Sequence, residues 1–314
     1  MTYYNRRWTL LRIRTMAIRD RIADSTAGLF QYADYPLAHS LEYPGDPGMF
    51  GPGSATWSVV GDVSTFVGGI RALLVQAAHP EVVAGVDDHS AYEADPLGRL
   101  SRTSAYVTAT AFGADPEVDA AIGAVRRAHR PVRGTSHRGV DYSAAGPAFA
   151  SWVHNALTDS FAVTYEVFGP PGNTVDLDRF VSEQTMLGAR LHADDLPDTS
   201  AGLAAWIADH PAVAPSPGME RVVRFLRKPP LPAGPAVGYR VLFGAAVATL
   251  PDRIASTLGV SAPPGAISAA RVIVNGLRWS MGSSPSWWLA LERVGEEAPP
   301  GVEFRRQPPI ASVA

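Results

Sequence analysis

Residues 95–130 have the sequence DPLGRLSRTSAYVTATAFGADPEVDAAIGAVRRAHR and contain the boundary residues of two consecutive helices. In the dipeptides Asp95-Pro96 and Asp115-Pro116, the aspartate is a preferred N-cap and the proline a preferred first helical residue. Gly113 is typical of the position that follows the last residue of a helix. The stretch therefore predicts one helix that ends near Phe112 and a second that begins at Asp115.

Helical spacing of apolar residues continues over most of the chain. No convincing alternation of apolar and polar residues and no internal repeat is present, so the sequence predicts no strand. Further helices are predicted at residues 64–78, 80–86, 147–168, 176–192, 198–210, 218–227, 238–250, 252–258 and 264–282. We therefore expect an all-α protein with around ten helices.

The chain divides into three predicted parts. Residues 1–58 combine a basic amphipathic helix, residues 1–30, with a lead-in dense in proline and glycine. Residues 59–285 form the main helical body, which we expect to be a multi-helix single domain. Residues 286–314 form an extended C-terminal arm that is rich in proline.

The composition excludes several classes of chemistry and partner. The 314 residues include no cysteine, which rules out disulfides, thiolate metal sites, a cysteine nucleophile and cysteine-ligated haem. The formal net charge of −3 argues against a nucleic-acid partner. The longest apolar runs, Phe66–Ala78 and Val241–Leu250, are too short or too interrupted to span a bilayer. We expect a cytoplasmic protein, in which the N-terminal helix either packs on the domain or makes weak contact with a membrane surface.

Residue types suited to binding a charged ligand gather in residues 95–130. Arg99 and Thr103 stand four apart, so both lie on one face of the first helix. His129 continues the apolar stripe of the second helix, after Val118, Ile122 and Val125. An imidazole buried between such helices is able to ligate iron. The alternative is a core histidine that bonds to a backbone carbonyl, with Arg99 solvated or paired to Asp95.

Seven short segments continue this pattern along the chain. They are His79-Pro80, Asp87–Ser90, Asp95–Thr103, Phe112-Gly113, Val125–Gly134, Tyr142–Ala144 and Trp152–His154. In their order and spacing they resemble the rubber-oxygenase (latex-clearing protein) and MpaB-type oxygenase family. The similarity is strongest over residues 55–170 and extends to about residue 285, which makes residues 59–285 the expected catalytic domain.

The resemblance implies a haem b protein with an all-α, globin-like core. It makes His129 the proximal ligand of the iron, and Arg99 and Thr103 the residues that contact and position the haem. Arg102 stands where rubber oxygenases carry a lysine near the distal side. Val83 stands at about the position of their distal glutamate, so the rubber-type cleavage mechanism is not implied as a whole.

His154, on the apolar helix predicted at residues 147–168, is a further candidate for the haem edge or the distal side. The alternative for His154 is a structural histidine in the core.

The resemblance further implies an oxygenase that activates O₂ to oxidise, or to cleave at a C=C bond, an apolar, isoprenoid-like small molecule. Arg99, Arg102 and Thr103 are the candidate catalytic residues. Three alternatives remain open: a haem enzyme that uses peroxide, a carrier of haem or of a hydrophobic ligand without turnover, and an ordinary helical bundle with a core histidine.

Overall fold

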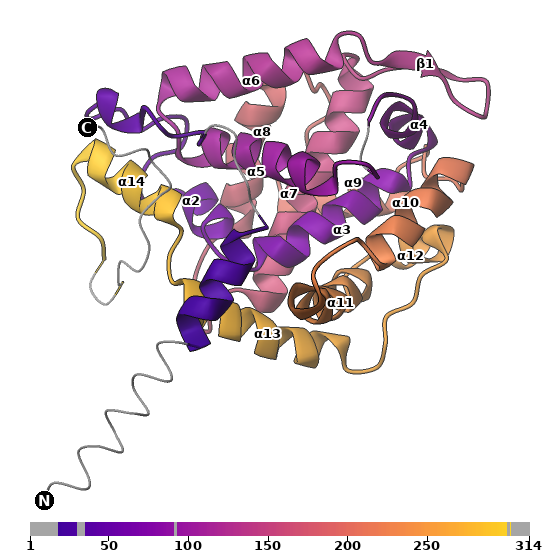
Figure 1. Cartoon of the computed structure of the whole chain (residues 1–314). Coiled ribbons are helices and arrows are strands. Elements are labelled where there is room, and N and C mark those ends of the chain that lie inside the picture. Colours follow the sequence, from indigo (N-terminus) through magenta and orange to yellow (C-terminus); the bar gives the residue numbers. More distant parts are fainter. Residues whose placement is uncertain (1–17, 30–34, 91–92, 300–301, 303–314) are drawn as a thin grey trace, which may run out of the picture.

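The computed structural model of the chain is almost entirely helical, which confirms the all-α prediction, and it describes residues 18–29, 35–90, 93–299 and 302 (Figure 1). The first 17 residues, over which most of the predicted N-terminal helix falls, lie outside the described residues, and residues 18–27 are helical. The elements that follow are the 3₁₀ helix η1 (Ser40–Glu42), α2 (Ala55–Val60), α3 (Thr65–Ala77), α4 (Pro80–His89), α5 (Pro96–Phe112), α6 (Asp115–His129), β1 (Arg133–Thr135), β2 (Asp141–Ser143), α7 (Pro147–Phe168), α8 (Leu177–Arg190), α9 (Ser200–Asp209), α10 (Pro217–Arg227), α11 (Ala233–Ala248), α12 (Asp252–Leu258), α13 (Ala266–Met281) and α14 (Pro285–Val294). Within the described residues no helix is both long enough and apolar enough to cross a bilayer.

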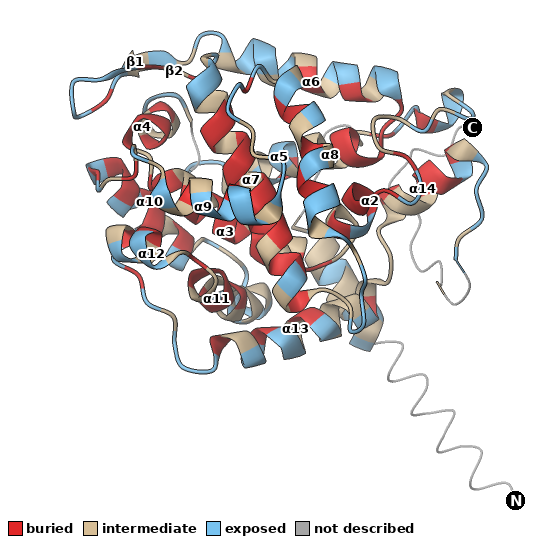
Figure 2. Cartoon of the chain, turned by 180° about the vertical axis from the view of Figure 1, so that it is seen from behind, coloured by how far each residue is buried: buried red, intermediate tan, exposed pale blue. Residues whose placement is uncertain are grey.

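The helix pair α3 and α7 forms the centre of the molecule. Buried residues run along most of both helices (Figure 2). Helices α10, α11 and α4 pack against α3, and helices α8 and α9 pack against α7. The hairpin of α5 and α6 lies further out and contacts the centre through α2 and α8.

A glycine allows α3 and α7 to approach closely. A Cβ atom at Gly68 would stand 2.7 Å from Cδ1 of Phe161 and 2.8 Å from Oγ1 of Thr164. Both distances are shorter than carbon contacts in a close-packed interior allow. At Gly69, the next residue, a Cβ atom would meet nothing within 4 Å. Of the two adjacent glycines, Gly68 is therefore required for the close packing of α3 on α7, and Gly69 is not.

A buried ion pair crosses the same interface. Nη1 of Arg71 lies 2.6 Å from Oδ2 of Asp159, and both side chains are almost fully buried. The guanidinium also donates to Oγ of Ser160 and, through Nε, to the carbonyl of Thr249 at the end of α11. These bonds join α3, α7 and α11, and they satisfy charges that would otherwise be costly to bury.

The structure corrects the sequence prediction in three places. Residues 133–135 and 141–143 form a short antiparallel hairpin, with Gly134 opposite Tyr142, where no strand was predicted. The lead-in of residues 34–58 contains η1 and most of α2. The arm predicted to be extended from residue 286 begins with a helix, because α14 covers Pro285–Val294 and packs against α5 and η1.

The glycine contact predicts opposite effects at adjacent positions. Gly68→Ala should lower the free energy of unfolding by about 1–3 kcal/mol, because Phe161 and Thr164 must move to accept the new methyl group. Gly69→Ala should leave it unchanged or raise it by up to about 1 kcal/mol, because alanine is the better helix former. Chemical denaturation of the two variants measures both values, and equal effects would contradict the packing described here.

The buried ion pair predicts a large cost for losing one partner. Asp159→Asn should lower the free energy of unfolding by about 3–5 kcal/mol, because it leaves the Arg71 charge buried without its counterion. Arg179→Ala is the matched control, since the exposed guanidinium of Arg179 pairs with Glu183 at 2.9 Å, and without it Glu183 keeps the hydrogen bonds from the backbone N–H groups of Ala55 and Thr56. Loss of that pair should cost about 1 kcal/mol or less. A cost of Asp159→Asn equal to that of Arg179→Ala would show that the buried pair adds no more stability than the exposed one.

Candidate functional site

The candidate site is built on the hairpin of α5 and α6. Only Gly113 and Ala114 separate the two helices, so they run antiparallel, and the start of α5 lies beside the end of α6. Helix α5 begins as predicted, because Oδ1 of Asp95 accepts a hydrogen bond from the backbone N–H of Gly98 at 3.0 Å. At the turn, Oε2 of Glu117 accepts from the backbone N–H of Ala114 at 2.9 Å.

A buried arginine from the far end of the chain holds this turn. Arg293 of α14 donates to the carbonyl of Phe112, the last residue of α5, at 2.8 Å. It also donates to Oγ of Ser40 at 2.6 Å and to the carbonyl of Asp46 at 2.7 Å. The guanidinium thereby satisfies a carbonyl that the end of α5 leaves free and fixes the direction in which the hairpin leaves the core.

The hairpin brings Arg99 and His129 together at its open end. Burial lowers the pKa of His129 below its ordinary value, and the nearby charge of Arg99 lowers the same pKa further. The imidazole makes no hydrogen bond to any residue that the structure describes. His129 is therefore a neutral, half-buried imidazole with an available lone pair, which is the state a metal-ligating histidine requires.

The three predicted site residues of α5 bond to different partners. Nη1 of Arg99 donates to Oγ of Ser90 at 2.6 Å, a contact that no sequence pattern indicated. Thr103 is exposed, and its hydroxyl donates back to the carbonyl of Arg99 at 3.1 Å. Arg102 is exposed and lies 3.2 Å from Oδ2 of Asp95. Of the predicted α5 residues, Arg99 is the one whose charge acts on His129.

Tyr106 adds a polar atom to this face of α5 that the sequence analysis did not include among the site residues. It follows Arg99 by seven residues, or two helical turns, so the two share one face. Its hydroxyl is buried and has no hydrogen-bond partner among the described residues. Burial raises the pKa of that hydroxyl, which is therefore neutral. A buried hydroxyl without a partner is uncommon in native proteins and marks a place where a ligand atom would be stabilised.

His154 lies elsewhere, in the contact between α7 and α8. Its Nε2 donates to the carbonyl of Gln184 at 2.9 Å, and a Cβ atom at Gly188 would stand 2.8 Å from its Cδ2. Burial lowers its pKa to about 4. The described residues show no contact that joins His154 to Arg99 or His129. His154 therefore takes part in the packing between α7 and α8.

Val83, at about the position of the distal glutamate of rubber oxygenases, lies on α4, and so do three acids. Val83 is buried in the main core, and the three acids of α4 already have partners. Oε2 of Glu81 lies 2.5 Å from Nη2 of Arg138. Burial raises the pKa of Glu81, but the hydrogen bonds from Arg138 and Ser136 outweigh it and hold this pKa below its ordinary value. Asp87 pairs with Arg221, and Asp88 accepts from Tyr142 at 2.7 Å. Helix α4 therefore provides no free carboxylate.

Within the described part of the chain, no three His, Asp or Glu side chains stand close enough together to hold a metal ion. A metal centre at the hairpin would need ligands from outside the protein. A porphyrin supplies four nitrogen ligands, so a haem iron requires one imidazole from the chain. The residues at the hairpin fit that requirement, with a neutral imidazole, a neighbouring guanidinium and a buried hydroxyl without a partner.

This all-α chain is an oxidoreductase, as its family shows. Residues 57–279, more than half of the chain, match the model of the family described as ER-bound oxygenase mpaB/B'/Rubber oxygenase, catalytic domain, so the chain belongs to that family. The match runs from α2 to the end of α13 and confirms the resemblance inferred from the sequence. No curated protein and no solved structure matches the chain significantly.

The environment of His154 predicts a pH dependence of stability. The unfolded chain protonates this histidine near pH 6.5, whereas the folded chain does so near pH 4. Between these values the unfolded state binds more protons. The contribution of His154 to the free energy of unfolding is therefore fully present above pH 6.5 and is lost as the pH falls toward 4. Each such histidine contributes about 1.4 kcal/mol per pH unit. Unfolding curves at several pH values should show a shallower decline for His154→Gln than for the native chain.

The exposed loop residue His137 provides the control for this experiment. His137→Gln should keep the native pH dependence, because the exposed side chain is replaced without any change in the core. An unchanged slope in His154→Gln would show that burial between α7 and α8 does not hold this imidazole neutral.

Proposed function

We propose that the chain is a haem b-dependent oxygenase, with residues 59–285 as its catalytic domain and His129 as the one protein ligand of the iron. The observation that carries this proposal is the neutral imidazole of His129 beside Arg99 at the open end of the α5–α6 hairpin. Membership of an oxygenase family supports the class of reaction. The bound haem would supply an iron that activates O₂.

The remaining residues of the hairpin would hold the group in place. The guanidinium of Arg99 has the planar shape and permanent charge that suit a haem propionate. Tyr106 would gain a polar partner for its buried hydroxyl. Thr103 lies one turn from Arg99 on the same face, and its hydroxyl would turn from its own helix to contact the haem. Arg102 would keep a positive charge near the distal side, and in this structure it pairs with Asp95.

The partners of the α4 acids bear on the reaction that such a site performs. A carboxylate that accepts a proton during catalysis must be free to do so. Glu81, Asp87 and Asp88 are all held by other side chains, so α4 supplies no general base. This observation favours oxidation steps that need no carboxylate, and it keeps a haem enzyme that uses peroxide as the second candidate function.

The proposed substrate is an apolar, isoprenoid-like small molecule that is oxidised, or cleaved at a C=C bond, with O₂ in the cytoplasm. The family description names rubber oxygenases, whose named substrate is a polymer of isoprene units. A carrier that binds haem or a hydrophobic ligand without turnover is distinguished by oxygen uptake. The loaded protein should consume O₂ when given an isoprenoid substrate or an electron donor, whereas a carrier consumes none.

Haem content tests the assignment of residues directly. The native chain purified from haem-sufficient cells should contain about one haem b per chain, measured by the pyridine haemochrome assay and the Soret band. His129→Ala should abolish or greatly reduce the content, because it removes the iron ligand. Arg99→Ala should lower it, because it removes a propionate partner.

Matched controls separate loss of haem from loss of folding. His137→Ala and Arg127→Ala change exposed residues of the same types and should keep the native haem content. Helical circular dichroism should be unchanged in all four variants. Native Soret intensity in His129→Ala, with an unchanged spectrum on adding CO, would remove His129 as the iron ligand.

A further inference from the structure

The distribution of charge along the chain is strongly uneven. Between Arg221 and Leu291 the sequence contains eight Lys or Arg residues and a single acid, Asp252, although the whole chain has a net charge of −3. Helices α11 and α13 contain no acid at all. This concentration of positive charge in one part of an otherwise acidic protein points to a negatively charged partner for that part.

Most of these cations are exposed and lack an ion-pair partner. Arg224, Arg227, Lys228 and Arg240 are exposed, and none of them forms an ion pair within the residues that the structure describes. Arg224 and Arg227 lie three residues apart on one face of α10, and Arg240 lies on α11, which packs beside α10. Their charges are available to a partner in solution.

The same helices carry the most exposed apolar side chains of the described chain. Val272 of α13 is 73% exposed and Val237 of α11 is 64% exposed. Trp279 follows Val272 by seven residues on the same face of α13, is 43% exposed, and lies under the guanidinium of Arg19 at 5.9 Å. We call the surface made by Arg224, Arg227, Lys228, Val237, Arg240, Arg271, Val272 and Trp279 the α11–α13 face.

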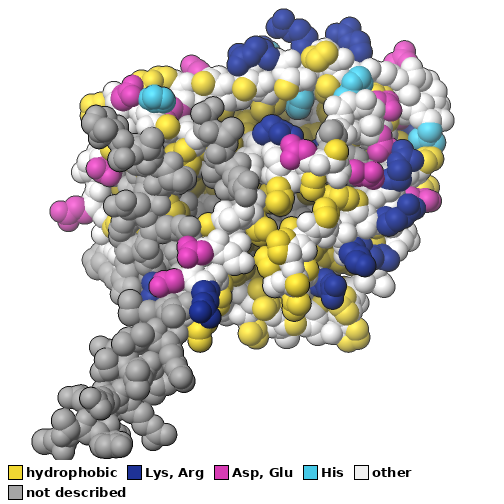
Figure 3. All heavy atoms as spheres, viewed as in Figure 1, with side chains coloured by type: hydrophobic (Ala, Val, Ile, Leu, Met, Phe, Trp, Pro, Cys, Tyr) yellow, Lys and Arg dark blue, Asp and Glu magenta, His cyan; other side chains and the backbone are white. Residues whose placement is uncertain are grey.

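Figure 3 shows how charge and apolar groups are arranged on one side of the molecule. Lys and Arg side chains lie beside hydrophobic ones over the lower right, where Figure 1 places α10 and α11. Most Asp and Glu side chains in this view lie over the upper half and the left, and some lie at the right edge beside the upper cations. The face therefore presents cations and apolar groups together, with one exposed acid, Glu220, four residues before Arg224 on α10.

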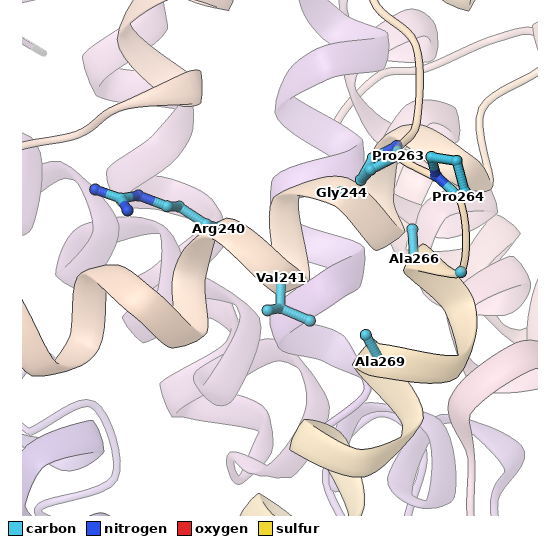
Figure 4. A pocket seen from close by; sticks show the side chains of 8 residues that line it. Arg240, Val241, Gly244, Pro263, Pro264, Ala266 and Ala269 are labelled. Carbon is cyan, nitrogen blue, oxygen red and sulfur yellow. The ribbon is translucent and has the colours of Figure 1, made fainter.

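A shallow apolar hollow opens on this face between α11 and the start of α13 (Figure 4). Its volume is about 180 Å³, and the residues that line it are Arg240, Val241, Gly244, Pro263, Pro264, Gly265, Ala266 and Ala269. Val241 and Ala269 approach each other across it, while the side chain of Arg240 points away from it. The hollow offers space for an apolar group next to a cation.

We infer that the α11–α13 face binds the surface of a membrane that contains anionic phospholipids. Cations near such a surface are attracted by its negative potential, and exposed valine and tryptophan side chains enter the boundary between headgroups and acyl chains. A nucleic acid would use the cations and leave Val237 and Val272 without a role. The described helices bind at this surface without crossing the bilayer. This inference does not depend on haem binding.

Vesicle co-sedimentation of the full-length protein tests the inference. The native chain should bind phosphatidylcholine vesicles that contain phosphatidylserine, bind pure phosphatidylcholine vesicles weakly, and dissociate as salt is added. The double variant Lys228→Ala with Arg240→Ala should bind the anionic vesicles about 25-fold more weakly, since each cation contributes about fivefold. Val272→Ser should also weaken binding, because it removes the most exposed apolar side chain.

Two controls carry matched changes outside the face. Arg127→Ala removes an exposed cation of α6, and Val140→Ser replaces a valine of the β-hairpin loop that is 47% exposed. Both should bind anionic vesicles as the native chain does. Equal binding to the two kinds of vesicle, or equal losses in the controls, would overturn the inference. It would also be overturned if the chain bound single-stranded RNA, or formed dimers through this face, without binding vesicles.

Discussion

The close contact between α3 and α7 is the constraint on which the other elements depend. A glycine at residue 68 lets the two helices meet side chain against backbone, and the Arg71–Asp159 pair holds them in one register. Because Arg71 also binds the carbonyl of Thr249, the position of α11 follows from the same contact. The α5–α6 hairpin and the α11–α13 face are therefore arranged on a centre that tolerates little change in side-chain volume or charge.

Three buried or half-buried histidines of this chain differ in what their rings contact. His154 is deeply buried and bonded to the Gln184 carbonyl, and His79 is packed against Trp152 and His210 with ring centroids 5.4 and 5.8 Å away. Burial lowers the pKa of His79 to about 4. These side chains are part of the packing. His129 has lost its charge in the same way, but among the described residues it has neither a hydrogen bond nor a contact with an aromatic ring.

The helices could be predicted from the sequence because their boundaries are local. Asp95, Pro96 and Gly113 mark α5, and Pro147 and Gly169 mark α7, all within one turn of the residues they affect. The hairpin of β1 and β2 escaped prediction because three-residue strands are too short for an alternating pattern. The proximity of Arg99 to His129 follows from a two-residue connection, whereas the bonds of Glu81 with Arg138 and of Arg71 with Asp159 join residues far apart in sequence. No local sequence pattern predicts bonds between residues so far apart.

The arginine of α14 that holds the turn of the hairpin has a consequence for biosynthesis. Arg293 lies 181 residues after Phe112, whose carbonyl it binds. A nascent chain that has completed α5 and α6 still lacks the guanidinium that fixes their orientation, and it acquires it only when α14 has been made. The order of translation thus separates formation of the two helices from their final placement, which waits until α14 has been made.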